Sequence, residues 1–305
     1  MSDVFEQLGM TPKNGALTPE QIAKVKGLGC LRDKRYEDVF NVRVLTGNGK
    51  ISTEKHRIVA EAADRFGSGE VALTGRMTFE IQGVPYDKIP DLVFFLKENG
   101  MECGGTGPKV RPVVSCKGTS CVFGLIDTYS LSEKIHNRFY LGFHNEILPH
   151  KFKIAVGGCP NNCVKPDLND LGIVGCRIFT PKTTLCRGCK TCGPAEHCPM
   201  GAILMENGKV KLDPAICNRC GRCLQSCPFG VFAEAKAGYR MALGGRWGKK
   251  GSQGRFINHI FESEDDVLNA IEKAILLFRD EGIKGERFAE TIQRLGAEYV
   301  EQKIL

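Results

Sequence analysis

The sequence predicts an α+β fold that carries a small cysteine-rich insert. Over the first hundred residues, apolar patterns of strand and helix period alternate between turn signals. Such patterns continue up to residue 180 and resume after residue 232. Between these points, residues 181–232 hold eight of the fifteen cysteines of the chain. This abrupt change of composition indicates an inserted module.

Three domains follow from these boundaries. Residues 1–110 are predicted to form an N-terminal domain, residues 111–180 together with 233–305 a second domain, and residues 181–232 the insert. A chain of 305 residues is long enough for two or three such domains with proper cores.

The N-terminal domain is predicted from helix caps and turn signals. Thr18 to Gln21 has the form of a capping box with proline at the first helical position, which predicts a short helix. Asn48-Gly49 indicates a turn, and Gly67 and Gly100 indicate helix ends. The predicted elements are helices over 19–27, 53–66 and 90–99 and strands over 40–45 and 71–81, a module with βαβ character.

The second domain is predicted from apolar periodicity. A strand is expected at residues 113–114 and a helix at about 125–138. Ser263 has the position of an N-cap, and apolar residues line one face of the following helix up to Gly282. A last helix is expected from about 286 to 295.

Composition excludes several classes of protein. The apolar runs are too short to cross a bilayer, and no secretory signal is visible, so we expect a cytoplasmic protein. The net charge of +7 fits nucleic acid, an acidic protein or a polyanionic cofactor as partner, or solubility alone; no long basic run favours nucleic acid. In a chain without an export signal, clustered cysteines indicate metal ligands more than disulfides.

Two cysteine runs form the most specific motif. Each has three cysteines at intervals of three residues and ends in Cys-Pro: Cys186, Cys189, Cys192 and Cys198, then Cys217, Cys220, Cys223 and Cys227. A loop of this spacing wraps three corners of an iron-sulfur cubane, and the fourth cysteine reaches the other cluster. The runs resemble a bacterial two-cluster ferredoxin, with five residues before Cys198 as a departure. Paired zinc sites are the alternative, which the repeated triplets disfavour.

That resemblance implies two [4Fe-4S] clusters with exchanged fourth ligands. One cluster would take Cys186, Cys189, Cys192 and Cys227, and the other would take Cys217, Cys220, Cys223 and Cys198. The function of such a module is to conduct electrons, so a site that receives them is expected elsewhere in the chain.

Four further cysteines supply that site. They are Cys116 and Cys121 in SCKGTSC, and Cys159 and Cys163 in GGCPNNC. Two such pairs resemble the site of the sulfite and nitrite reductase family, in which four cysteines hold a [4Fe-4S] cluster and the last, here Cys163, bridges to the iron of a sirohaem. The first pair is spaced by four residues where the family usually has five, a departure that affects the shape of the loop against the macrocycle.

The resemblance covers most of the chain and implies its fold. Residues 1–110 would be the ferredoxin-like half-domain of the family, and the second domain would be the α/β domain that binds sirohaem and a [4Fe-4S] cluster. The segment GYRMALGGRWGKKG resembles the glycine-rich return that follows the insert in this family, and such an insert is typical of its dissimilatory and anaerobic branches. The chain looks most like the catalytic C subunit of an anaerobic sulfite reductase.

The family also presents cations to its anionic substrate. NVRVLTGNGKIS and LTGRMTFEIQGV look like the segments that carry anion-binding arginines, here Arg43 and Arg76, and LPHKFKI looks like the segment with a lysine pair, here Lys151 and Lys153. On a strand, residues two apart point to the same face, so the lysine pair can meet one anion. These cations would hold the anion and supply protons as its bonds to oxygen break.

Other side chains are implied as contacts of the cofactor. Besides Cys163, the expected sirohaem-binding residues are Arg76, Arg111, Lys117, Thr119, Asn161, Asn162 and Arg240. Cys30, Cys103 and Cys176 fit no ligand spacing and are expected to be small buried apolar residues.

The predicted function is the six-electron reduction of sulfite to sulfide. No flavin or nicotinamide fingerprint is visible, so an external ferredoxin or a partner reductase subunit must supply electrons. Ammonia-forming nitrite reduction is the alternative on the same site, and an electron-transfer subunit without catalytic haem is the alternative of another class. Because one copy of a repeat unit is present where longer relatives have two, a homodimer or a heteromer is expected.

Overall fold

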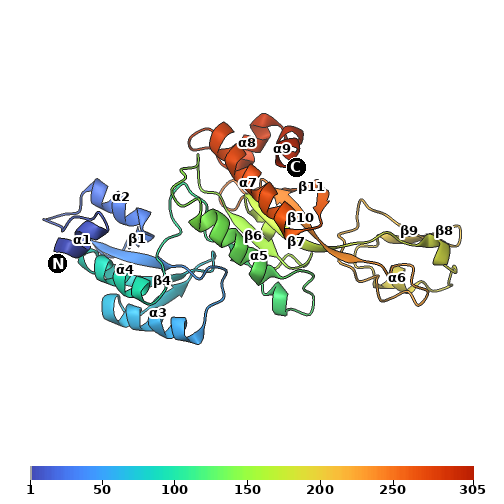
Figure 1. Cartoon of the computed structure of the whole chain (residues 1–305), viewed down its shortest axis with the longest axis horizontal. Helices are drawn as coiled ribbons and strands as arrows, with labels where there is room; N and C mark the ends of the chain where they lie inside the picture. The colour runs from blue at the N-terminus through green and yellow to red at the C-terminus, as the bar shows by residue number, and fades with distance from the viewer. Residues whose placement is uncertain (1) are drawn as a thin grey trace. The chain divides into compact units, whose positions relative to one another are not determined.

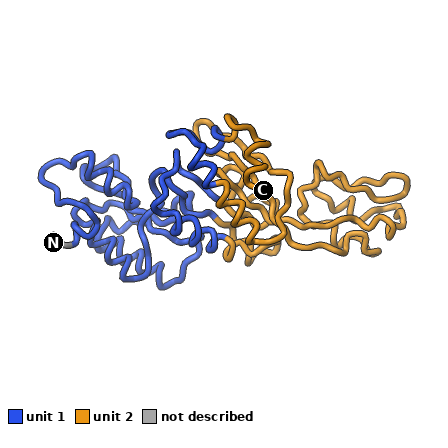
Figure 2. Tube along the Cα trace, turned by 45° about the horizontal axis from the view of Figure 1, so that its top comes forward, with its two compact units in different colours: residues 1–114, 132–154, 275–291 blue, residues 115–131, 155–274, 292–305 orange. Residues whose placement is uncertain are grey.

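The computed structural model describes residues 2–305 (Figure 1). The chain divides into two compact units (Figure 2). Unit 1 comprises residues 1–114, 132–154 and 275–291, and unit 2 comprises residues 115–131, 155–274 and 292–305. Among the described residues, no helix combines the length and the apolar character that crossing a membrane requires.

The N-terminal part of unit 1 is a four-stranded antiparallel sheet with strand order β1-β2-β4-β3. Its strands are β1 Cys30–Arg32, β2 Val39–Val44, β3 Val71–Leu73 and β4 Phe79–Pro85. Its helices are α1 Ser2–Gln7, α2 Pro19–Gly27, α3 Thr53–Phe66 and α4 Ile89–Glu98, with a short turn of 3₁₀ helix, η1, at Tyr86–Lys88.

Local signals place these helices where the sequence predicts them. The Thr18 hydroxyl accepts a hydrogen bond from the Gln21 amide, and the Gln21 side chain accepts one from the Thr18 amide, so the capping box before α2 is complete. At the start of α3 the Ser52 hydroxyl accepts a hydrogen bond from the Lys55 amide, and the helix ends before Gly67 as predicted. The predicted helix bounds in this part of the chain are confirmed within one residue.

The predicted strand over 71–81 is wrong, because the structure has a hairpin there. β3 and β4 are separated by residues 74–78, and Leu73 pairs with Phe79. Met77 adopts a positive φ of 55°, and the Thr74 and Thr78 hydroxyls lie 2.7 Å apart, which closes the turn. The expected βαβ character is also wrong, since all three strand pairs are antiparallel.

The alternation of side chains along β2 determines on which face of the sheet Arg43, the first candidate residue, lies. Phe40, Val42 and Val44 of β2 are buried in a core shared with α3 and α4. Burying each of these apolar side chains contributes about 1.5–3 kcal/mol. Arg43 lies between two of them and therefore points to the opposite face of the sheet, away from the core.

A five-stranded sheet has the order β11-β10-β7-β6-β5. Its strands are β5 Val114–Ser115, β6 Ile154–Gly157, β7 Leu171–Ile178, β10 Lys236–Leu243 and β11 Arg255–Phe261. The remaining helices are α5 Thr128–Ile135, α7 Glu264–Glu281, α8 Phe288–Leu295 and α9 Ala297–Ile304, and short helical turns lie at Gly118–Ser120, Pro166–Leu168 and Thr183–Leu185.

Helix bounds in this part of the chain differ from prediction at several ends. α5 starts three residues later than expected and continues as a π-helix, His136–Leu141, and α8 starts at Phe288. α9 was not predicted. The Ser263 hydroxyl accepts from the Asp266 amide, so the predicted N-cap of α7 is confirmed.

The cysteine-rich segment 181–232 leaves the end of β7 and returns at the start of β10. These strands pair antiparallel, with Ile178 opposite Lys236, so the segment is an excursion between neighbouring strands. It contains α6 Gly193–His197 and a hairpin of β8 Ile203–Glu206 and β9 Lys209–Leu212, which Figure 1 shows beside each other. Its core combines apolar side chains with cysteines. The predicted domain boundaries remain a prediction.

Candidate functional site

Unit 1 holds a cluster of guanidinium groups. The Nε of Arg43 donates a hydrogen bond of 3.1 Å to Glu80 Oε2, its partner in the β2–β4 ladder. Arg111 lies near enough that the charge of Arg43 lowers the pKa of Arg111, and Arg287 acts on Arg111 in the same direction. Together with burial, which is the largest cause, this repulsion brings the pKa of Arg111 to about 10.

Arg111 in this cluster has a hydrogen-bond donor that a ligand could use. Arg111 is half-buried and donates to the Gly105 carbonyl, while its Nε is buried and makes no hydrogen bond among the described residues. Arg287 is 4% exposed. A buried donor such as the Nε of Arg111 favours a ligand that offers an acceptor. Arg287 was not among the predicted residues, since it lies in no recognisable motif, and only its burial beside Arg111 reveals it.

Arg76 is held by backbone carbonyl groups. It belongs to the turn between β3 and β4, and its Nη2 donates to the carbonyls of Pro112 and Ile154, the latter at 3.0 Å. Its own amide donates to the Thr74 hydroxyl at 3.2 Å. These contacts fix the guanidinium beside the segment that carries Lys151 and Lys153.

The lysine pair lies just before β6, on either side of Phe152, which forms an isolated bridge with Val110. Phe152 and Ile154 are fully buried, whereas Lys151 and Lys153 are half-buried, an alternation that fits the predicted common face of the two lysines. The Phe152 ring packs against the rings of Phe278 and Phe288, with centroids 5.8 and 5.1 Å away. This packing anchors the face opposite the lysines.

Unit 2 brings four predicted thiols together. Burial raises the pKa of Cys159, and the nearby thiols of Cys116, Cys163 and Cys121 raise it further. Cys116 and Cys121 flank a short 3₁₀ turn, and Cys159 follows β6. Among the described residues, no three His, Cys, Asp or Glu side chains are arranged to hold a single metal ion. The four cysteine sulfurs of a cubane each bind a different iron atom at a separate corner, whereas the ligands of a single metal ion converge on one point.

The loops that carry these thiols are packed backbone to backbone. The Gly158 amide donates to Cys116 Sγ at 3.1 Å, and the Thr128 hydroxyl donates to the Cys116 carbonyl at 2.7 Å. A Cβ on Gly118 would lie 2.9 Å from Gly158 Cα, so this contact requires glycine. Thr128 was not predicted as part of the site.

The predicted cofactor contacts in unit 2 lie on the same loops. Lys117, Thr119 and Asn161 are exposed, and Thr119 Oγ1 donates to Asp127 at 2.7 Å. Asn162 has a φ of 58° and donates to Asp167 at 2.8 Å, while its buried Oδ1 has no hydrogen-bond partner among the described residues. Such an acceptor fits a polar ligand.

The eight cysteines of segment 181–232 line two cavities, four to each. One is lined by Cys198, Cys217, Cys220 and Cys223. The other, of about 90 Å³, is lined by Cys186, Cys189, Cys192 and Cys227. This division has the same membership as the two predicted ligand sets. We call these cavities the Cys217 pocket and the Cys186 pocket.

The two pockets differ electrostatically. Burial raises the pKa of Cys223 to about 12, and the neighbouring Cys217, Cys220 and Cys198 thiols raise it further. Conversely, a backbone hydrogen bond from Gly188 lowers the pKa of Cys186. A bound iron cluster would supply the positive charge that keeps buried thiols ionised.

Arg240 lies beside the Cys217 pocket. Its guanidinium stacks over the Phe256 ring at 4.2 Å. Burial is the largest cause that lowers the pKa of Arg240, and the charge of Arg219 lowers it further, while Cys176 and Cys217 act in the opposite direction. Cys176 and Cys30 are fully buried, and burial raises the pKa of Cys103 to about 12. The expected burial of Cys30 and Cys176 is confirmed, whereas the expected burial of Cys103 is wrong, since Cys103 is only partly buried where it packs against the core of unit 1.

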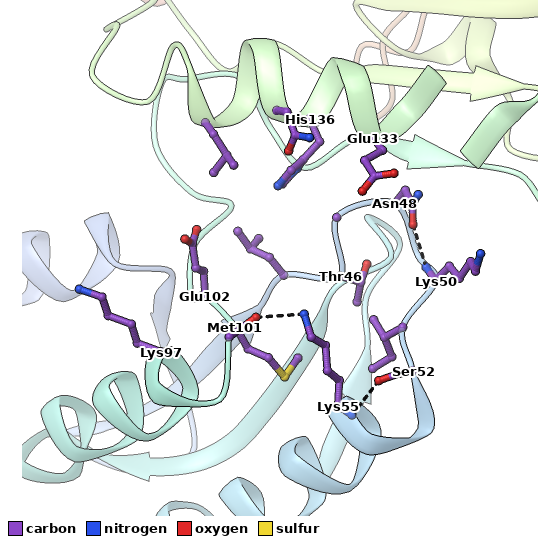
Figure 3. A pocket seen from close by; sticks show the side chains of 16 residues that line it. Thr46, Asn48, Lys50, Ser52, Lys55, Lys97, Met101, Glu102, Glu133 and His136 are labelled. Atoms are coloured by element: carbon purple, nitrogen blue, oxygen red, sulfur yellow. Dashed lines mark hydrogen bonds between the residues drawn. The ribbon is translucent and has the colours of Figure 1, made fainter. Parts of the chain in front are cut away.

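A separate pocket of about 630 Å³ lies in unit 1 (Figure 3). Lys55 donates to the Gly100 carbonyl at 3.0 Å, and the His136 ring stacks on Tyr140 at 4.9 Å. Burial lowers the pKa of His136, with Glu102 and Glu133 opposing. None of the predicted site residues lines this pocket, and its mixed charges point to no single ligand.

Comparison with known proteins identifies the family. The family described as "Nitrite and sulphite reductase 4Fe-4S domain" matches residues 106–304, and "Nitrite/Sulfite reductase ferredoxin-like half domain" matches residues 32–99. The chain belongs to the nitrite and sulfite reductase family. Members of this family are oxidoreductases with a 4Fe-4S domain.

Two relatives illustrate the relationship. The coenzyme F420-dependent sulfite reductase of Methanocaldococcus jannaschii is 30% identical over 88% of this chain, which spans 42% of that protein. The C subunit of the anaerobic sulfite reductase of Salmonella typhimurium is 27% identical over 87% of this chain and 81% of its own length. The expected likeness to an anaerobic sulfite reductase is confirmed, although the F420-dependent type is more similar.

A solved structure supports the fold of this family member. The crystal structure of dissimilatory sulfite reductase I superposes with a TM-score of 0.70 at 22% identity, covering 87% of this chain and 69% of that one. The half-domain and the 4Fe-4S domain expected from the sequence are thus confirmed as the fold.

Proposed function

We propose that this family member is a sirohaem-[4Fe-4S] sulfite reductase that carries sulfite to sulfide with six electrons. The observation that carries the proposal is the gathering of Cys116, Cys121, Cys159 and Cys163 on tightly packed loops. These four thiols would hold the first [4Fe-4S] cluster, with Cys163 as the bridge to sirohaem. Sirohaem, when bound, supplies the iron at which the sulfur of the anion is reduced.

The cations of unit 1 would bind the negative charge of the substrate and the cofactor and would supply protons. Arg43 and Arg76 would bind the oxygens of sulfite, and Lys151 and Lys153 would donate protons to oxygens that leave as water. Arg111, whose buried Nε makes no hydrogen bond among the described residues, would meet a cofactor carboxylate, with Arg287 beside it. Lys117, Thr119, Asn161 and Asn162 would contact the cofactor from the thiol loops, and Arg240 from β10.

Two more [4Fe-4S] clusters would lie in segment 181–232, as an inserted ferredoxin domain. The division of its cysteines between the Cys186 and Cys217 pockets supports this. An external one-electron donor would then feed the chain, since no nucleotide-binding fingerprint is visible in the sequence.

The test is anaerobic turnover of the purified holoprotein with a reduced viologen dye. Sulfite and nitrite are compared by kcat/KM, and sulfide and ammonium are assayed as products. We expect a clear preference for sulfite with sulfide as product. A strong preference for nitrite would favour the alternative reaction, and no turnover with either anion, together with a spectrum lacking sirohaem bands, would favour an electron-transfer subunit.

We also propose that the active site is shared between protomers of a dimer or heteromer. In this proposal the four cations, Arg43, Arg76, Lys151 and Lys153, of one protomer face the cluster of the other. The prediction is tested by mixing a Lys151→Gln/Lys153→Gln variant with a Cys163→Ser variant under conditions of subunit exchange. Restored sulfite turnover, up to about a quarter of the wild-type rate for random pairing, is expected. If exchange is demonstrated by mass and activity stays absent, each site is built from one protomer.

A further inference from the structure

Three arginines of unit 2 lie beside the Cys217 pocket. They are Arg177 on β7, Arg219 between Cys217 and Cys220, and Arg240 on β10, and we call them the arginine cluster. The Arg177 amide donates a hydrogen bond of 2.9 Å to the Arg219 carbonyl, which connects the sheet to the cysteine loop. Since β7 also pairs with β10, the three arginines come from elements that are bonded to one another.

The loop that lines the Cys217 pocket is in contact with the Arg177 side chain. Gly221 lines the pocket with a φ of 77°, and a Cβ at this position would lie 2.7 Å from Arg177 Cγ. Burial raises the pKa of Cys217, whereas a hydrogen bond from the Arg219 backbone and the charge of Arg219 act in the opposite direction. The cluster therefore acts on a predicted ligand of the pocket.

The three guanidinium groups also act together on one buried thiol. Cys176 is fully buried on β7 and is not a predicted ligand. Burial raises the pKa of Cys176 to about 11, and the charges of Arg240, Arg219 and Arg177 act in the opposite direction. Cys217 is in turn a charged neighbour of Arg240. The positive charges of the arginine cluster are thus close enough to one another to act on the same group.

No carboxylate neutralises the arginine cluster within the described part of the chain. Its three members form no ion pair there, and no Asp or Glu is among the charged neighbours of Arg240. An arginine side chain keeps its charge in proteins, so this positive charge is permanent. A thiolate-bound iron-sulfur cubane carries a net negative charge, which the cysteines of the Cys217 pocket would place beside the cluster.

The basic side chains beside the Cys186 pocket are exposed, in contrast. Arg187 stacks over the Phe229 ring at 4.9 Å, and Lys209 donates to the Cys186 carbonyl at 2.5 Å, but both residues are exposed to water. The members of the arginine cluster are only partly exposed. Because water and salt screen exposed charges more than partly buried ones, fixed positive charge acts mainly on the Cys217 pocket.

We propose that the arginine cluster raises the reduction potential of the [4Fe-4S] centre in the Cys217 pocket. The inference rests on the proposed function of segment 181–232 as a pair of clusters. On reduction the centre gains one electron, and no bond is made or broken. Burial disfavours the added negative charge, whereas nearby positive charge and hydrogen bonds to the cysteine sulfurs favour it. The arginines bind no iron and would keep a partly buried centre reducible.

The test is a potentiometric titration of the iron-sulfur centres in the anaerobic holoprotein, with sodium dithionite as reductant and electron paramagnetic resonance as readout. Arg219→Gln and Arg177→Gln each remove one charge of the cluster, and Arg219→Lys and Arg177→Lys retain it. Arg240 is not varied, because it is also proposed as a contact of sirohaem. As comparisons, Lys209→Gln removes a charge beside the Cys186 pocket, and Lys250→Gln removes an exposed charge from the same unit.

We expect each glutamine variant of the arginine cluster to lower the ratio of reduced to oxidised centre about tenfold at a fixed potential, which is ~59 mV for one electron. This shift should affect one centre only, and the lysine variants should stay close to the wild type. Lys209→Gln should affect a different centre and less strongly, because Lys209 is exposed. Lys250→Gln should leave every potential unchanged.

Unchanged potentials in both Arg219→Gln and Arg177→Gln would overturn the proposal, as would an equal shift in Lys250→Gln. The same shift in the lysine and glutamine variants would also overturn it, since the effect would then not depend on charge. Two arginines are varied separately, so that a centre lost on assembly in one variant leaves the other variant to decide.

The outcome is separable from that of the proposed function. A wild-type protein whose iron content leaves no clusters for the segment would overturn both proposals. Sulfite turnover with both clusters present and with unchanged potentials in the arginine variants would overturn this inference alone. Potentials that shift as expected in a protein without sulfite turnover would support this inference and count against the proposed reaction.

Discussion

Replacing Cys163 by serine is expected to lower viologen-driven sulfite turnover by at least about a thousandfold, which corresponds to ~4 kcal/mol of transition-state stabilisation. In the proposed site this thiolate is both a ligand of the first cluster and the bridge to sirohaem. A hydroxyl is a poor substitute for either role, since iron-sulfur clusters are held by thiolates. Turnover and the visible spectrum of the purified variant provide the measurement.

A matched control is available in Cys30→Ala. Cys30 is 1% exposed in β1 and belongs to no predicted ligand set. The Cys30→Ala substitution should lower the free energy of unfolding by about 1 kcal/mol because packing is lost, and it should leave turnover and the visible spectrum unchanged. Full sulfite turnover in Cys163→Ser would refute the assignment of the four-cysteine site.

Replacing Lys153 by glutamine is expected to reduce kcat for sulfite about a hundredfold. The amide retains a hydrogen-bond donor but loses the charge and the transferable proton. The kcat/KM for nitrite, which carries one negative charge, should decrease less than the kcat/KM for sulfite. The ratio of kcat/KM for sulfite to kcat/KM for nitrite should therefore fall. Steady-state assays with both anions measure this ratio.

Lys134→Gln serves as the comparison, because Lys134 is an exposed lysine of α5 in the same unit. It should leave both reactions within about twofold of the wild type. An equal loss for sulfite and nitrite in Lys153→Gln would show that Lys153 contributes binding common to both anions and does not select between them.

Much of the fold could be predicted because its signals are local. The capping box of α2 lies within four residues of the helix start, and its hydrogen bonds form as expected. The β3–β4 hairpin was missed because its turn depends on a positive φ at Met77, a residue type with no preference for that conformation. α9 was missed because it follows Gly296, which reads as a helix end.

The candidate site was predictable to the extent that spacing along the chain determines it. Cysteines three residues apart must lie together, and the crossing of Cys198 and Cys227 between the two sets is what the resemblance to a two-cluster ferredoxin implies. Arg287 could not be found in this way, because its proximity to Arg111 arises from the return of a distant segment into unit 1. The role of Thr128 in supporting Cys116 likewise depends on how α5 packs.

The backbone packing between Gly118 and Gly158 bears on which residues define the cluster site. Both thiol loops are fixed by contacts of the polypeptide itself: the close glycine pair, the Gly158 amide on Cys116 and the Thr128 hydroxyl. A small zinc finger, by contrast, has no fold until its metal binds. The positions of the two thiol loops therefore depend on Gly118, Gly158 and Thr128 as well as on the ligands of the cluster, so residues that bind no iron help to define the cluster site.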